Sequence, residues 1–153
     1  MEQNALNFLR DSFVHHRSLR SSLDQKSSFL VGVSGIIFGL SVGHLDEIHF
    51  LVLAITCFLT VLLSISATFL PFRRHAKEKF GSMCWLGFSD RSFNQYKDEL
   101  DEVFASDEKM AEEYMKEIYS LANYSIKLKV KYLKWASIIL IIGLFAGFIS
   151  SFI

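Results

Sequence analysis

The sequence predicts an all-α membrane protein: three transmembrane helices with a helical cytoplasmic extension. Three long apolar stretches, at about residues 27–43, 48–70 and 133–153, are the main basis for this prediction. A helix needs about 20 apolar residues to cross a bilayer core of ~30 Å, and the second stretch reaches that length without a charged residue. Hydrophobic residues make up 51% of the 153-residue chain, and its single proline, Pro71, directly follows the second stretch.

The distribution of Lys and Arg predicts how the three spans are oriented. Basic residues precede the first span and lie at both ends of the segment between the second and third spans, whereas the turn at residues 43–49 has neither Lys nor Arg. Positive charge in short loops stays in the cytoplasm. We therefore expect the N-terminus to be inside and the C-terminus to be outside.

Four segments follow from these boundaries. We expect residues 1–26 to form a cytoplasmic amphipathic helix that runs straight into the first span, and residues 27–71 to form a transmembrane hairpin. Pro71 marks where the second helix ends or kinks. Residues 72–132 form a cytoplasmic helical region, and residues 133–153 form the third transmembrane helix.

Capping signals divide the cytoplasmic region into helices. Asp90 or Ser92 is suited to cap a helix over residues 93–104, and Ser106 is suited to begin another. From there no Gly or Pro intervenes until Gly143, so one continuous helix from Ser106 to the end of the chain is expected.

The first half of this long helix has an apolar seam that we expect to pack on the N-terminal helix. The charged pairs Glu112-Glu113 and Lys116-Glu117, and Lys127, are expected to face solvent. The seam residues recur at alternating four- and three-residue steps: Tyr114, Ile118, Leu121, Ser125, Leu128, Tyr132 and Trp135.

Small residues mark the packing faces of the spans. The first span has Gly35, Gly39 and Gly43, and the third has Gly143 and Gly147. Spacing of small residues by four lets helix backbones approach closely in lipid. The spacing leaves open whether these faces meet within one chain or between chains. We favour at least one contact between chains, and hence a homo-oligomer.

Polar residues are scarce inside the spans. No Asp, Glu, Lys or Arg lies in the middle of a span, which disfavours proton or ion pathways of the usual kind. The hydroxyls of Ser64, Ser66 and Thr68 could line a wet path, but we favour hydrogen bonds within the helix bundle.

Charged residues do lie at the span entrances. Asp24 and Lys26 precede the first span, and Asp24 could cap the helix or pair across the bundle with a lysine such as Lys131. Interfacial anchoring explains these residues, and a role in coupling the cytoplasmic part to the membrane part is the alternative.

Several classes of function are not supported. The chain has no GxSxG, Walker-type, HExxH or CxxC motif, so we expect neither an enzyme nor a catalytic residue, and no cofactor. Cys57 and Cys84 fall in different parts of the predicted topology, and the five His are scattered, so no metal site is expected. The net charge of zero gives no global field for a nucleic acid polymer.

The chain as a whole resembles the small transmembrane effectors of Pycsar antiphage systems. The resemblance covers most of the chain and combines several dispersed features. These are Asp24-x-Lys26 before a Gly-rich span, Pro71 after the second span, the segment from Phe80 to Phe88, Tyr96 with Leu100, Glu117-Ile118-Tyr119-Ser120-Leu121-Ala122, and Lys131-Tyr132-Leu133.

This resemblance implies a multi-pass protein of the bacterial inner membrane that acts in antiphage defence. A partner cyclase would make cyclic CMP or cyclic UMP on infection, and the effector would then disrupt the membrane and kill the cell. No cyclic-nucleotide-binding β-roll is recognisable, so the helical cytoplasmic segment would have to build the site. Residues whose side chains suit a phosphate and a pyrimidine ring are Arg73, Arg74, Lys77, Lys79, Trp85 and Phe88.

Two other functions fit the same residues. One is a constitutive oligomeric channel or pore subunit, which would conduct ions without a nucleotide. The other is a structural membrane adaptor that recruits a partner through its charged helices.

Overall fold

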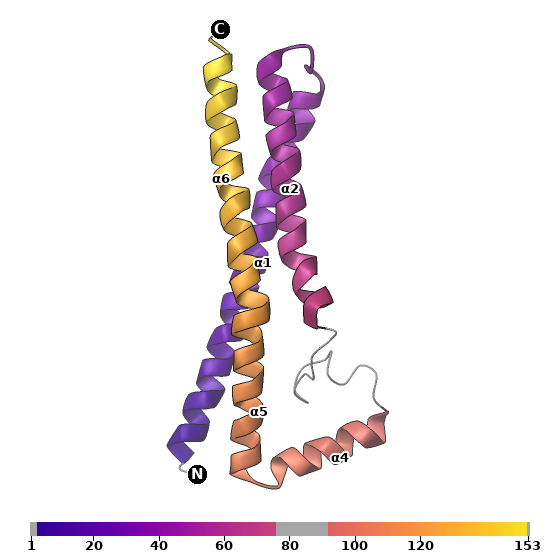
Figure 1. The fold of residues 1–153 in the computed structure, drawn as a ribbon, viewed down its shortest axis with the longest axis vertical. Coiled ribbons are helices and arrows are strands. Elements are labelled where there is room, and N and C mark those ends of the chain that lie inside the picture. Colours follow the sequence, from indigo (N-terminus) through magenta and orange to yellow (C-terminus); the bar gives the residue numbers. More distant parts are fainter. Residues whose placement is uncertain (1–2, 76–91, 153) are drawn as a thin grey trace. The chain divides into compact units, whose positions relative to one another are not determined.

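The computed structural model describes residues 3–75 and 92–152, which are helical apart from short turns and chain ends and include no strand (Figure 1). The helices are α1 (Gln3–Val42), α2 (Ile48–His75), α4 (Phe93–Phe104), α5 (Asp107–Ser120), a short π-helical segment η1 (Leu121–Ile126) and α6 (Lys127–Ser150). The expected all-α architecture is therefore confirmed.

Three of these helical stretches are long and apolar enough to cross a membrane: Asn4–Val42, Ile48–Phe69 and Asp107–Ser150. The first and third extend well beyond their apolar parts, because each begins with a polar stretch that continues into the span without a break. The chain is thus a multi-pass membrane protein, and the expectation that its N-terminal helix runs straight into the first span is confirmed.

The two predicted caps are also confirmed. At α4, the Ser92 hydroxyl accepts a hydrogen bond from the Gln95 backbone N–H at 3.4 Å, and the Gln95 side chain accepts one from the Ser92 N–H at 3.0 Å. At α5, the Ser106 hydroxyl accepts from the Lys109 N–H at 3.2 Å. Each cap satisfies N–H groups that have no partner inside the helix.

Pro71 does not end the second helix. The helix α2 continues to His75, four residues beyond it. Proline removes one backbone hydrogen bond and disfavours the helical conformation of the residue before it, but the helix continues past it. Of the two predicted alternatives, the one in which α2 ends at Pro71 was therefore wrong.

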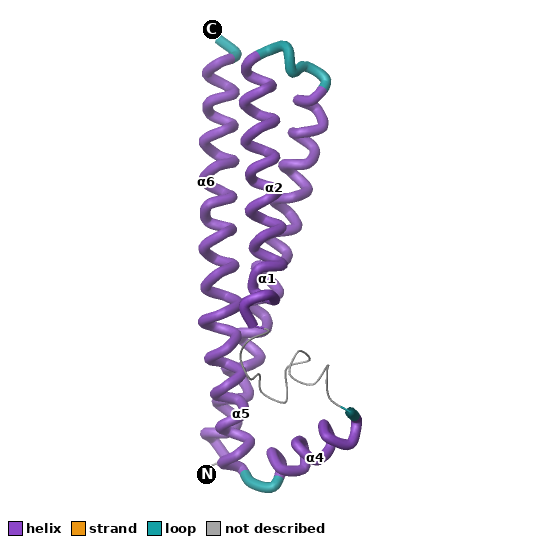
Figure 2. Tube along the Cα trace, turned by 45° about the vertical axis from the view of Figure 1, so that its right-hand side comes forward, coloured by secondary structure: helices purple, strands orange, loops and turns teal. Residues whose placement is uncertain are grey.

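The described chain divides into two compact units. The extension unit comprises Met1–Ser21 and Phe72–Lys127, and the span unit comprises Ser22–Pro71 and Leu128–Ile153. In the span unit, the end of α1, α2 and α6 lie side by side, and α6 ends near the turn that joins α1 to α2 (Figures 1 and 2).

In the extension unit, α5 packs on the first part of α1, as the seam predicted. The rings of Phe13 and Tyr114 meet edge to face with centroids 5.7 Å apart. The prediction that the charged pairs face solvent was wrong for Glu113 and Glu117, which are only 7% and 4% exposed. Ala111 and Ser125 are buried as well.

The seam prediction was also wrong at Trp135, which is 53% exposed. A π-helical turn contains one more residue than an α-helical turn, so η1 shifts the positions that follow it by one. The buried residues beyond η1 are accordingly Lys129, Leu133 and Ala136, one position after the predicted Leu128, Tyr132 and Trp135. The seam that was extended from the residues before η1 did not predict this shift.

Candidate functional site

The span unit has an apolar outside and an interior of small and polar residues. Large apolar side chains point outward, among them Phe29, Ile36 and Phe145, which are 70%, 68% and 66% exposed. The buried residues are Leu23, Ser27, Ser34 and Ser41 from α1, Ala54, Cys57, Thr60, Ser64 and Ala67 from α2, and Lys129, Leu133, Ala136, Leu140, Gly143 and Gly147 from α6. Such an arrangement suits lipid around the helices and a narrow interior between them.

The buried positions follow the spacing of helices packed side by side. On α6 they recur at steps of four and three, and on α1 the buried serines Ser27, Ser34 and Ser41 are seven residues apart. A seven-residue repeat keeps one face turned to a neighbouring helix. Both repeats are visible in the sequence, so this signal could have identified the interior before the structure was known.

An ion pair lies at the end of the span unit that is opposite the α1–α2 turn. The Lys129 Nζ atom donates to the Asp24 Oδ1 atom. The side chain of Lys129 is 2% exposed and that of Asp24 is 41% exposed. A buried ammonium group is costly unless a negative charge compensates it, so Asp24 stabilises the charge of Lys129.

The lysine that pairs with Asp24 is thus not the one suggested by the sequence. Lys131 and Lys26 are both exposed. Extending the repeat of four- and three-residue steps backward from Gly147 within α6 reaches Lys129 rather than Lys131. The sequence thus predicted that Asp24 pairs with a lysine across the bundle, but the lysine is Lys129, two residues before the suggested Lys131.

A line of hydroxyl groups continues from this ion pair along the interior. The Ser27 hydroxyl donates to the Ser64 backbone carbonyl at 2.9 Å and lies 3.4 Å from the Thr68 hydroxyl. Thr60 and Ser41 donate to carbonyls of their own helices, each at 2.8 Å. Asp24, Lys129 and these hydroxyls, together with the hydroxyls of Ser34 and Ser64, are called the polar row below.

Two hydroxyls of the polar row have no hydrogen-bond partner among the described residues. They belong to Ser34 and Ser64, both 0% exposed. A buried hydroxyl without a partner costs about 1–3 kcal/mol. The antiparallel register set by the Ser27–Ser64 contact places Ser34 near the level of Cys57, seven residues before Ser64 on α2, so the two hydroxyls are separated along the row. Either one would gain free energy if water reached it.

The glycines of the first and third spans have different neighbours. A Cβ atom at Gly143 would overlap the Thr56 side chain, and one at Gly147 would come within 2.7 Å of Leu53. The third-span glycines therefore bring α6 close to α2 within the chain. In contrast, a Cβ atom at Gly35, Gly39 or Gly43 would meet no atom within 4 Å in the part of the chain that the structure describes.

The residues expected to bind a nucleotide are only partly placed. Arg73 and Arg74 lie in the last turns of α2, with side chains outside what the structure describes. The other four candidates, Lys77, Lys79, Trp85 and Phe88, lie outside the described residues. Within the described ranges, no group of three His, Cys, Asp or Glu residues is arranged to hold a metal ion.

Two ion pairs set the local electrostatics of the extension unit. Lys109 Nζ lies 2.9 Å from Glu102 Oε1 and links α4 to α5, and its hydrogen bond lowers the pKa of the Glu102 carboxyl. Lys116 Nζ lies 2.9 Å from Glu112 Oε1, which raises the pKa of the Lys116 ammonium. Both pairs are exposed and contribute little to stability.

Comparison with known proteins identifies one family. The sequence model of the Pycsar effector protein domain matches residues 8–153, which is nearly the whole chain. No curated protein and no solved structure matches the chain.

Proposed function

Because the chain belongs to the Pycsar effector protein domain family, we propose that this antiphage defence effector responds to cyclic CMP or cyclic UMP by disrupting the bacterial inner membrane. The family supports the effector role, and the features of the span unit support the rest. In this proposal the protein acts without catalysis: it binds the nucleotide made by a partner cyclase and changes its own packing in the bilayer.

The observation that carries the proposal is the polar row inside helices whose outer faces are apolar. A bundle that only anchored a protein in lipid would gain nothing from burying Ser34 and Ser64 without hydrogen-bond partners. When water enters the row, both hydroxyls gain partners. The interior is therefore close in free energy to a hydrated state, and a modest change in helix packing opens a polar path.

Nucleotide binding shifts the equilibrium between the closed and hydrated states. A ligand shifts such an equilibrium only by the difference between its affinities for the two states. The proposed binding residues are Arg73, Arg74, Lys77, Lys79, Trp85 and Phe88, whose cationic and aromatic side chains suit a cyclic phosphate and a pyrimidine ring. Since Arg73 and Arg74 lie at the end of α2, binding there would act directly on a helix that contributes Thr60 and Ser64.

Association of several chains supports the hydrated state. Among the described residues, no atom lies within 4 Å of the position that a Cβ atom would take at Gly35, Gly39 or Gly43. Each glycine inside a helix costs about 1 kcal/mol relative to alanine, and a face that touched only lipid would not need them. We propose that this face of α1 packs against another copy of the chain, so that the effector works as a homo-oligomer.

The orientation that fits this function has the N-terminus and residues 72–132 in the cytoplasm, where the nucleotide is made. The arrangement of Lys and Arg supports it. This orientation can be tested by treating intact cells with a membrane-impermeant thiol reagent. Two cysteine variants are needed, each made in a chain that lacks Cys84. Asp46→Cys, in the turn between α1 and α2, should be labelled from outside, and Asp98→Cys should not.

The function itself is tested in bacteria that express the full chain with or without a pyrimidine cyclase. Entry of a membrane-impermeant dye should follow cyclase induction within one growth cycle and should depend on the chain. Dye entry without any cyclase would favour the constitutive pore instead. If cells accumulate cyclic CMP and cyclic UMP and the dye stays out, the proposed function is wrong.

A further inference from the structure

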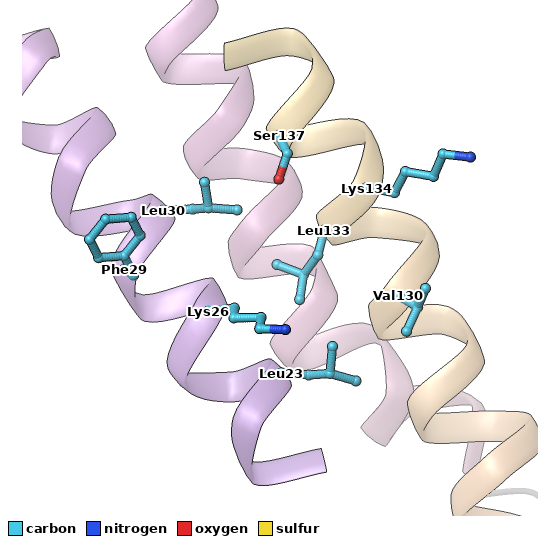
Figure 3. Close-up of a pocket in the computed structure, with 8 residues that line it drawn as sticks. All are labelled: Leu23, Lys26, Phe29, Leu30, Val130, Leu133, Lys134 and Ser137. Carbon is cyan, nitrogen blue, oxygen red and sulfur yellow. The ribbon is translucent and has the colours of Figure 1, made fainter. Parts of the chain in front are cut away.

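The span unit has a groove on its outer surface, between α1 and α6, that is separate from the polar row. Its volume is about 460 Å³, and eight residues line it: Leu23, Lys26, Phe29, Leu30, Val130, Leu133, Lys134 and Ser137 (Figure 3). This volume falls in the range of about 300–1,000 Å³ that is common for small-molecule sites.

The groove is built by the parallel packing of α1 on α6. Leu23 and Leu133 are only 7% and 6% exposed and form its floor, whereas Phe29 and Val130 are 70% and 47% exposed and stand at its edges. Figure 3 shows the Lys26 side chain reaching from α1 toward α6 and the Lys134 side chain extending outward from α6. The groove is thus apolar along its base, with one ammonium group reaching across it from α1 and a second on the outer side of α6.

The charge of this groove is not compensated by its own lining. Two of the eight lining residues are lysines and none is acidic. Asp24, the acidic residue that lies next to this part of α1, already pairs with Lys129 in the interior. Lys26 directly precedes the first apolar stretch and Lys134 lies at the entrance of the third. The two ammonium groups therefore stand where an apolar helix surface meets the polar zone of a bilayer.

From this arrangement we propose that the groove binds one anionic phospholipid. One acyl chain lies along Leu30, Leu133 and Val130, and the phosphate lies beside Lys26, with the long side chain of Lys134 turning toward it from α6. Acyl chains gain little by moving from lipid to an apolar groove, since both surroundings are apolar. The preference for this lipid therefore comes from the two lysines, which attract a headgroup with a net negative charge.

The lining favours a lipid over a cyclic nucleotide, although both carry a phosphodiester. Ser137 is the only lining residue, apart from the two lysines, with a polar side chain. The edge of a pyrimidine base has several donors and acceptors, which would lose their hydrogen bonds to water here. An acyl chain has none.

The experiment measures lipid retention by the purified full chain without any nucleotide, so its outcome does not depend on the proposed function. Native mass spectrometry in detergent counts bound phosphatidylglycerol and, in a parallel sample, phosphatidylcholine with the same acyl chains. The wild-type chain should retain phosphatidylglycerol preferentially. Equal retention of the two lipids would overturn the proposal.

Two kinds of variant locate the site. Lys26→Gln combined with Lys134→Gln should weaken phosphatidylglycerol binding by roughly tenfold or more, because each lysine near an anionic headgroup contributes a several-fold preference. The matched control, Lys97→Gln with Lys131→Gln, removes the same charge from two exposed lysines outside the groove. An equal loss in both double variants would show only a general charge effect and would contradict a defined site.

Filling the groove tests the acyl-chain part of the proposal without changing charge. Val130→Trp replaces a half-exposed residue at the groove edge, so the fold should persist, which circular dichroism checks. Retention of phosphatidylglycerol should fall. Unchanged retention would place the lipid elsewhere, and displacement of the lipid by excess cyclic CMP or cyclic UMP would assign the groove to the nucleotide.

Discussion

The carboxylate of Asp24 and the ammonium of Lys129, which are 105 residues apart in sequence, form an ion pair that joins α1 to α6 in the span unit. Lys129 is almost fully buried, and Asp24 is partly open to its surroundings. This pair is at one end of the polar row, next to the Ser27 hydroxyl and opposite the α1–α2 turn. It couples the position of α6 to that of α1 by charge rather than by apolar packing.

Removing the charge of Asp24 should destabilise the span unit. Breaking a fully buried pair by removing one partner costs about 3–5 kcal/mol, and because Asp24 is 41% exposed we expect about 1–3 kcal/mol for Asp24→Asn. Unfolding in mixed micelles with increasing denaturing detergent measures the change. Asp46→Asn, in the exposed turn, is the control, and equal behaviour of the two variants would show that the pair contributes nothing.

Glycines in the first and third spans should respond oppositely to alanine. Gly143→Ala forces a methyl group into the Thr56 side chain and should cost about 1–3 kcal/mol. Gly39→Ala meets no atom within the chain and should leave the folded monomer intact or stabilise its helix by up to about 1 kcal/mol.

The same glycine variants test the proposed homo-oligomer. Size-exclusion chromatography with light scattering in mild detergent should show that Gly39→Leu shifts the chain toward monomer. If Gly39→Leu keeps the wild-type mass distribution, the face of α1 that carries Gly35, Gly39 and Gly43 is not an interface between chains.

Replacing the two unpartnered hydroxyls should reduce membrane leakage without reducing the stability of the fold. Ser34→Ala with Ser64→Ala removes buried groups that lack partners, so unfolding should be unchanged or shifted in favour of the folded state by about 1–3 kcal/mol. Membrane leakage should fall, because the row then hydrates less readily. Ser28→Ala is the control: its exposed hydroxyl bonds the Asp24 carbonyl within α1. If the double variant leaks as much as the wild type, the polar row does not take part in permeabilising the membrane.

The contact between α4 and α5 should depend on pH. The hydrogen bond and charge of Lys109 lower the pKa of Glu102 from its ordinary value of 4.5. The ion pair therefore stabilises the contact between α4 and α5 fully at a pH above 4.5, the ordinary pKa of the carboxyl. This stabilisation is lost as the pH falls through the lowered pKa. An NMR titration of the Glu102 carboxyl should show the low pKa, and Lys109→Gln should return it to the ordinary range. A shift of the same size with Lys97→Gln would contradict this assignment.

Much of the architecture could be predicted because it depends on local signals. Apolar length predicted the three spans, and the caps at Ser92 and Ser106 followed from single residues beside a helical pattern. The absence of Gly and Pro predicted that α5 continues into α6, and the helical stretch Asp107–Ser150 confirms it.

The interior was harder to predict because it depends on the rotation of each helix about its axis. The π-helical segment η1 moves the buried face of α6 by one residue, which places Lys129 instead of Leu128, and Ala136 instead of Trp135, inside the bundle. The sequence did show glycine stripes in two spans. Only the packed structure showed that a side chain at Gly143 would meet α2, whereas one at Gly39 would meet no other helix among the described residues.

The central claim is that a cyclic pyrimidine nucleotide makes this chain permeabilise a bilayer. It is tested most directly with the purified full chain in liposomes that contain a self-quenching dye. Cyclic CMP or cyclic UMP should release the dye from these liposomes, while cyclic AMP and protein-free liposomes should give no release. Release at the same rate without any nucleotide, or no release with either pyrimidine nucleotide, would contradict the claim.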